Sequence, residues 1–194
     1  MAFSPSGTLL ASTADGDGMV RLWDPATGQP VRVLHATSPR YGVSGVAFNR
    51  NGTVLASADG DGTVRLWTPA TGQAVRILHA TSPRYGVSGV AFSPSGTVLA
   101  SADGDGTVRL WNPATGQRVG APIPADPTPG GAVLAVAFGP SSHLLASGSN
   151  DGRVRLWDVT AFMNPHGTLC ADVGAPTRQE WQQYAAGEPQ PRVC

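Results

Sequence analysis

ASADGDGTVRLW occupies residues 56–67 and returns letter for letter at residues 100–111. Looser copies end at Trp23, in MVRLWDPATG, and at Trp157, in ASGSNDGRVRLWD. The four tryptophans lie 44, 44 and 46 residues apart, and a phenylalanine precedes each of them by 19 or 20 residues. A second stretch, HATSPRYGVSGVAF, is identical at 35–48 and 79–92. A fixed period of this length indicates a tandem array of one supersecondary unit.

Each unit has the pattern of four short β-strands separated by tight turns. In the third unit the apolar run YGVSGVAF precedes SPSG, a turn tetrad in which proline fixes φ and glycine closes the turn. TVLASA, TVRLW and AVRILHA are rich in apolar and β-branched residues, and they are bounded by DGDG and by NPATGQ or TPATGQ. No unit contains a long stretch with the 3.6-residue period of a helix. Four short strands in every 44 residues predict the radial sheets, or blades, of a β-propeller.

The block VAFSPSGTVLASADGDGTVRLWNPATGQ, at residues 90–117, resembles the WD-repeat β-propeller family, and the resemblance extends over residues 1–160. It implies an all-β propeller segment of four four-stranded blades in a partial or open ring, with a clipped first blade. The expected units are about 1–36, 37–80, 81–125 and 126–160.

The remaining residues, 161–194, form a C-terminal tail, in which LCADVGAPTRQEWQQYAAGEPQPRVC at residues 169–194 resembles the tail that closes many actinobacterial WD-repeat proteins. Thr177 and Glu180 have the spacing of a helix capping box. We expect a short helix here, whose Trp181 and Tyr184 dock the tail onto the last blade. Whether Cys170 and Cys194 are bonded stays open.

The resemblance also implies a hydrogen-bonded network in each blade, made by a second-strand hydroxyl, an aspartate in the next turn, the third-strand tryptophan and a histidine. A buried indole N–H needs an acceptor, which the hydroxyl supplies. In the first unit Ser12 and Thr13 are both candidates for that hydroxyl. The family's GH dipeptide is absent. Whether His35 and His79 fill the role of the family's histidine stays open. The matching residues are Asp17, Trp23, Ser57, Asp61, Trp67, Ser101, Asp105, Trp111, Ser147, Asp151 and Trp157.

An arc of blades leaves one face of each end blade uncovered, and a large exposed apolar patch is unusual on a monomer. Three arrangements remain open. Two chains pair into an eight-bladed ring, the four blades close on themselves, or the chain is a piece of a longer propeller, which is the reading we favour.

Composition and motifs argue against several kinds of function. Thirteen acidic residues balance thirteen basic ones without a basic cluster, so we expect neither nucleic acid nor membrane as a partner. With no secretory signal and no apolar run long enough to span a bilayer, the sequence predicts a cytoplasmic protein. We expect no metal or other cofactor, because the DGDG turns lack the remaining ligands of a calcium loop and no nucleotide-binding or hydrolase motif occurs.

Four arginines, each two residues before its tryptophan, are expected to pack over the indoles or neighbouring blades: Arg21, Arg65, Arg109 and Arg155.

The sequence therefore predicts a non-catalytic scaffold that binds a protein or peptide, as the partner-recognition or sensor part of a bacterial regulatory protein. In this family partners usually dock on the loops before the first strand and after the second. Arg40, Tyr41, Arg84 and Tyr85 lie there and are residue types enriched in binding hot spots. The alternatives are a propeller that regulates an ATPase or kinase encoded upstream and, less favoured, a propeller-based hydrolase.

Overall fold

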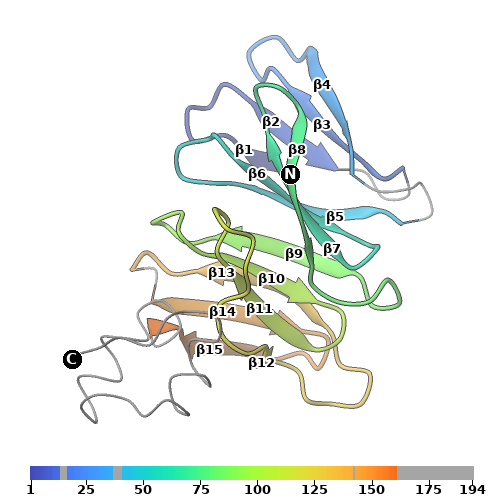
Figure 1. Ribbon diagram of the computed structural model, residues 1–194, viewed down its shortest axis with the longest axis vertical. Helices are drawn as coiled ribbons and strands as arrows, with labels where there is room; N and C mark the ends of the chain where they lie inside the picture. The colour runs from blue at the N-terminus through green and yellow to red at the C-terminus, as the bar shows by residue number, and fades with distance from the viewer. Residues whose placement is uncertain (14–16, 37–40, 142, 161–194) are drawn as a thin grey trace.

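The computed structural model describes residues 1–13, 17–36, 41–141 and 143–160, and these residues form four antiparallel sheets (Figure 1). Three sheets have four strands and the fourth has three described strands, each sheet in chain order. The prediction of an all-β, partial propeller is confirmed.

The first sheet contains β1 (Ala2–Phe3), β2 (Leu10–Thr13), β3 (Met19–Trp23) and β4 (Pro30–His35), and the second contains β5 (Val43–Phe48), β6 (Leu55–Asp59), β7 (Thr63–Thr68) and β8 (Gln73–His79). The third contains β9 (Val87–Phe92), β10 (Leu99–Asp103), β11 (Thr107–Trp111) and β12 (Ile123–Pro124), and the fourth β13 (Val133–Phe138), β14 (Leu144–Ser149) and β15 (Val154–Asp158).

Strand length departs from the sequence pattern in two places. The second strand of the second and third sheets continues through the first aspartate of DGDG, Asp59 or Asp103, which the sequence pattern had assigned to the turn. The last strand of the third sheet shrinks to β12, because Pro122 and Pro124 have no N–H to donate to a ladder. The segment GTLCADV, the candidate for the last strand of the fourth unit, lies outside the described residues, as does the expected helix.

Each sheet has two chemically different faces, because successive side chains of a strand point to opposite sides. On one face, which we call the tryptophan face, a Phe, a Leu and a Trp lie side by side, as in Phe48–Leu55–Trp67. On the other, which we call the alanine face, alanines of the second strand pair with a Leu and a Val of the third. In the third sheet these pairs are Ala100–Leu110 and Ala102–Val108.

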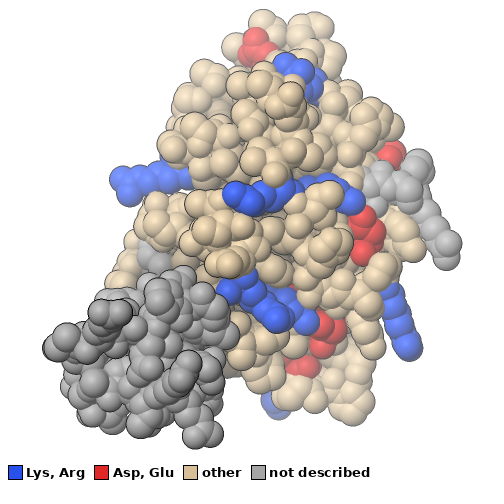
Figure 2. All heavy atoms as spheres, viewed as in Figure 1, with Lys and Arg blue, Asp and Glu red and all other residues tan. Residues whose placement is uncertain are grey.

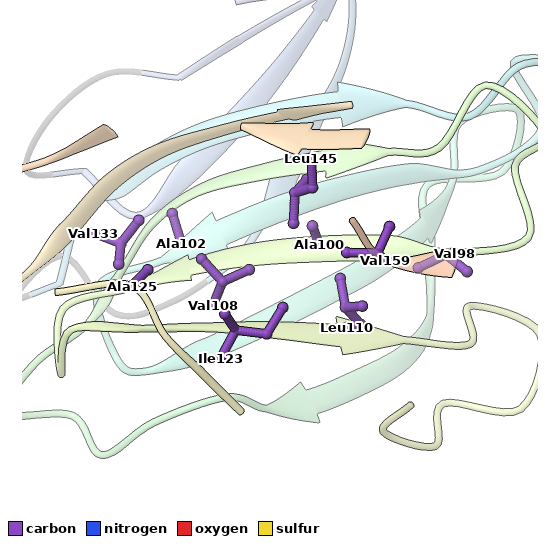
Figure 3. Packing of buried hydrophobic residues seen from close by; sticks show 10 residues of the cluster. All are labelled: Val98, Ala100, Ala102, Val108, Leu110, Ile123, Ala125, Val133, Leu145 and Val159. Atoms are coloured by element: carbon purple, nitrogen blue, oxygen red, sulfur yellow. The ribbon is translucent and has the colours of Figure 1, made fainter. Parts of the chain in front are cut away.

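The hydrophobic core consists of three layers, each between the alanine face of one sheet and the tryptophan face of the next. Figure 3 shows the last of them, in which Val108 and Leu110 of the third sheet point toward Val133 and Leu145 of the fourth. The buried side chains of these layers have almost no exposed surface. Consecutive sheets are therefore joined by the same apolar interface three times.

The sheets form an open row, with the first at one end and the fourth at the other (Figure 1). The tight closure of four blades on themselves is not the observed arrangement. The first strands of neighbouring sheets lie close together, and a Cβ on Gly45 would be 3.4 Å from Gly89 Cα. Glycine at these positions lets the strands approach one another along the inner side of the row.

Candidate functional site

Every sheet contains the same hydrogen bond from the tryptophan side chain to a serine on the second strand. The Nε1 atoms of Trp67 and Trp111 each donate to a serine Oγ at 3.1 Å, and both indoles are buried. In the first sheet the acceptor is Ser12, at 2.8 Å from Trp23 Nε1. In the fourth sheet Trp157 Nε1 donates to Ser147 at 2.9 Å. The bond gives the indole the acceptor that it needs away from water.

In the third sheet the network continues from serine into a buried ion pair. Ser101 Oγ donates to Asp103 Oδ2 at 3.3 Å, and Arg109 Nη1 donates to the same oxygen at 2.7 Å. Arg109 Nη2 also binds Asp105 Oδ2 at 2.7 Å. One guanidinium therefore joins two carboxylates, of which Asp103 is wholly buried and Asp105 lies in the turn.

The second sheet repeats this geometry. Arg65 Nη1 lies 2.6 Å from Asp59 Oδ2 and Arg65 Nη2 lies 2.9 Å from Asp61 Oδ2. Thr63 Oγ1 donates to Asp61 at 2.6 Å and accepts from Arg65 Nη1 at 2.7 Å. The turn between β6 and β7 is thus held by a compact set of charged groups.

Burial disfavours the charged forms of the buried aspartates and of the arginines, whereas their ion pairs favour them. Loss of solvation on burial raises the pKa of Asp59 and of Asp103 to about 6, although the bonds from arginine favour the carboxylate. Burial also works against the charge of Arg109, but its bonds to Asp105 and Asp103 outweigh that effect and raise the Arg109 pKa. The guanidinium stays charged, and the inner carboxyl is the group that titrates.

Arginine, which the family resemblance did not include in the network, takes part in it in the second and third sheets. His35 and His79 end β4 and β8, are exposed and make none of the bonds described above. The guanidiniums of the four arginines bind the turn aspartates in all four sheets. That their stems pack over the indoles or neighbouring blades stays a prediction.

Sequence reasoning missed two members of the network, Asp59 and Asp103. A signal for them existed, because Ser57 and Arg65 are direct cross-strand partners and an aspartate follows that serine by two residues. In the fourth sheet Ser149 occupies the corresponding position, and its Oγ has no hydrogen-bond partner among the described residues. Among the described residues, the first and fourth sheets show the outer pairs, Arg21–Asp17 and Arg155–Asp151. Asp15, the first aspartate of DGDG in the first unit, lies outside the described residues.

These networks lie beneath one edge of the row, formed by loop 80–86 and by turns 59–62 and 103–106, which we call the loop edge. Thr81 Oγ1 donates to Asp105 at 3.1 Å and so ties the loop to the turn of the next sheet. The backbone adds bonds from Thr81 N to Gly62 O at 3.0 Å and from Gly104 N to Gly86 O at 3.1 Å. The loop is therefore held on both sides.

The fixed loop presents Arg84 and Tyr85. Arg84 Cζ lies 5.6 Å from the centre of the Tyr85 ring, and Tyr85 is 48% exposed. Tyr41, at the corresponding position before β5, is half-buried, and Arg40 lies outside the described residues. The structure thus describes three of the four predicted contact residues and brings two of them together.

Charged side chains are dispersed over the surface seen in Figure 2, where arginines and aspartates alternate with uncharged areas. Within the described residues no group of three or more His, Cys, Asp or Glu side chains is arranged to hold a metal ion. In the same part of the chain no helix is long and apolar enough to cross a membrane.

The comparison with protein families gives one match, to the model of the WD domain, G-beta repeat, at residues 1–24, 28–68, 72–112 and 127–158. The matches contain all four networks and most of the chain. A search of curated proteins finds no match.

Proposed function

The chain belongs to the WD40 repeat family, and from that premise we propose that it is a protein-binding scaffold that holds its partner at the loop edge. WD40 repeat proteins are generally non-catalytic, and we assign no reaction to this chain. The observation that carries the proposal is the pair Arg84 and Tyr85, displayed on a loop that the turn networks hold on both sides.

A fixed loop favours binding because less conformational entropy is lost when the partner docks. Of the described cations at this edge, Arg84 stacks on an aromatic ring, whereas Arg65 and Arg109 neutralise carboxylates. Arg84 is thus the cation available for carboxylate or carbonyl oxygens of a partner. Tyr85 adds an apolar ring with a polar hydroxyl, a combination common in interface hot spots. Tyr41 extends the proposed surface to the previous sheet, and Arg40, which lies outside the described residues, stays a contact predicted from the sequence.

Site-specific photo-crosslinking tests this proposal. A photoreactive phenylalanine analogue replaces Tyr85 in cells that make the protein, and the control carries it at Thr97, which is exposed in a turn at the opposite edge. We expect a discrete protein adduct from position 85 and none from 97. With the purified partner, Arg84→Ala and Tyr85→Ala are each expected to weaken binding at least about tenfold. Equal adducts from both positions, or binding that ignores both substitutions, would contradict the proposal.

The same proposal has a finer part, in which the scaffold is the partner-recognition or sensor portion of a bacterial regulatory protein in the cytoplasm. Its support is the resemblance of residues 169–194 to the tails of actinobacterial WD-repeat proteins. A module that regulates an ATPase or kinase encoded upstream is the alternative. The DNA before the Met1 codon tests it, since an in-frame continuation with a nucleotide-binding motif favours the alternative. Self-association through the ends of the row is a separate mode of binding that we propose for the same chain.

A further inference from the structure

The two ends of the row present the two halves of the interface that joins its sheets internally. Three times in the chain, an alanine face packs on a tryptophan face. No described residue packs as a further sheet on the tryptophan face of the first sheet or on the alanine face of the fourth. Each end therefore has half of an interface whose complete form is visible inside the molecule.

The alanine face of the fourth sheet has the residues that the inner interfaces bury. Its cross-strand pairs are Ala146–Leu156 and Gly148–Val154. The corresponding leucine and valine of the second sheet, Leu66 and Val64, are 1% and 0% exposed. In the fourth sheet Leu156 is 65% exposed and Val154 is 74% exposed.

The tryptophan face of the first sheet is the complementary half. Phe3, Leu10 and Trp23 are cross-strand neighbours, as their counterparts are in the other sheets. Phe3 is 63% exposed and Leu10 and Trp23 are half-buried, whereas Leu55 and Trp67 of the second sheet are buried.

The turn after β3 also lacks the neighbouring sheet that the corresponding turns of the second and third sheets have. In the second sheet, Gly72 lies against side-chain carbons of Arg32 and Leu34, which come from the preceding sheet. In the third sheet, Gly116 lies against Arg76 and Leu78 in the same way. At Gly28, the first-sheet counterpart, a Cβ would meet no described atom within 4 Å. The first sheet is thus shaped to receive a preceding sheet.

We propose that the occupant of both ends is a second copy of this chain, with the alanine face of its fourth sheet docked on the tryptophan face of the first. The partner's chemistry follows from the repeat, since the required surface of Ala, Leu and Val is the one that this chain exposes at its other end. The contact is heterologous, joining unlike surfaces, and docking at both ends closes a ring of two chains. Such a ring has eight sheets, within the range of about four to eight found in propellers.

Light scattering coupled to size-exclusion chromatography tests the proposal on the full chain over about a hundredfold range of concentration, because association follows mass action. We expect the wild type to have twice the mass of one chain. Leu156→Asp at one end and Phe3→Asp at the other each place a carboxylate in the contact, and each is expected to weaken association at least about a hundredfold. Val75→Asp is the matched control, because Val75 is 55% exposed on β8 and belongs to neither end.

A mixture of the two end variants distinguishes unlike from like surfaces. Phe3→Asp keeps the alanine end and Leu156→Asp keeps the tryptophan end, so the mixture retains one intact contact and is expected to recover a two-chain species. Circular dichroism verifies that each variant is folded, and Val154→Asp replaces Leu156→Asp if that variant is not. The proposal is overturned if the wild type has the mass of one chain throughout, if the end variants associate as the wild type does, or if the mixture recovers nothing.

Discussion

Arg109 Nη1 lies 2.7 Å from Oδ2 of Asp103, a carboxylate with no exposed surface. The same guanidinium reaches Asp105, and Asp105 in turn accepts the Thr81 hydroxyl from the loop that presents Arg84 and Tyr85. A continuous set of polar contacts therefore leads from the buried tryptophan of the third sheet to the proposed binding surface. The stability of this network and the position of the loop are expected to change together.

Removing the guanidinium tests the buried pair. Arg109→Met leaves Asp103 buried without its cation, which is expected to lower the free energy of unfolding by about 3–5 kcal/mol at neutral pH. Arg155→Met is the control, because Ser149 occupies the position of the buried carboxylate in the fourth sheet and only the pair with Asp151 is lost, so a clearly smaller loss is expected. Urea denaturation measures both, and equal losses would show that the inner pair adds nothing.

The pH dependence of stability follows from the buried carboxyls. An unfolded aspartate has a pKa of about 3.9, whereas burial raises the pKa of Asp59 and Asp103 to about 6. Between these values the folded state holds more protons than the unfolded state, so the contribution of these groups to stability grows as pH falls from 7 toward 4.5. The gain is at most roughly 2–3 kcal/mol per carboxyl.

Below that range the outer carboxylates reverse the trend. The bond from Arg21 lowers the pKa of Asp17, and the bond from Arg155 lowers that of Asp151, so their contribution is lost as these groups protonate in acid. Urea denaturation from pH 7.5 to pH 3 is expected to show a maximum near pH 4–5. The variant with Asp59→Asn and Asp103→Asn is expected to lose the rise between pH 7 and 5. A wild-type stability that falls steadily over that interval would refute this account.

The serine acceptor is expected to matter most where its tryptophan is buried. Ser101→Ala leaves the Trp111 N–H without its acceptor in the core and removes one donor to Asp103, at an expected cost of about 1–3 kcal/mol. Ser12→Ala is expected to cost about 1 kcal/mol or less, because Trp23 is half-buried and water can replace the hydroxyl. Chemical denaturation measures the free energy of unfolding of both variants. Equal losses would show that the hydrogen bond to the buried tryptophan adds no stability.

The sequence predicted the fold class because the repeat fixes strand, turn and face together. It also indicated which side chains share the tryptophan face, since Arg109 and Trp111 are two residues apart on one strand. It did not predict the ion pair, because the partner of Arg109 depends on cross-strand register and on a strand that continues to Asp103. Nor could it show how loop 80–86 is held, since those contacts join different sheets and follow only from their packing.

Gly104 links the turn network to the binding loop, and its substitution tests both. A Cβ on Gly104 would overlap the carbonyl oxygen of Tyr85, so Gly104→Ala is expected to displace the loop and cost about 1–3 kcal/mol of stability. Gly148→Ala is the control, because a Cβ there meets no described atom within 4 Å and the second and third sheets already have Ala58 and Ala102 at that position. That control is expected to be neutral or to stabilise by up to about 1 kcal/mol.

The two variants also separate partner binding from folding. If Tyr85 contacts the partner, Gly104→Ala weakens binding of that partner at a temperature where the variant is still folded. Gly148→Ala leaves binding at loop 80–86 unchanged, because its Cβ would touch no atom of that loop. In Gly104→Ala, the yield of the photo-crosslinked adduct from position 85 should fall in parallel with the affinity for the partner. Full affinity in a folded Gly104→Ala protein would mean that the position of the Tyr85 backbone is irrelevant to recognition, and the contact surface would then have to lie elsewhere on the row.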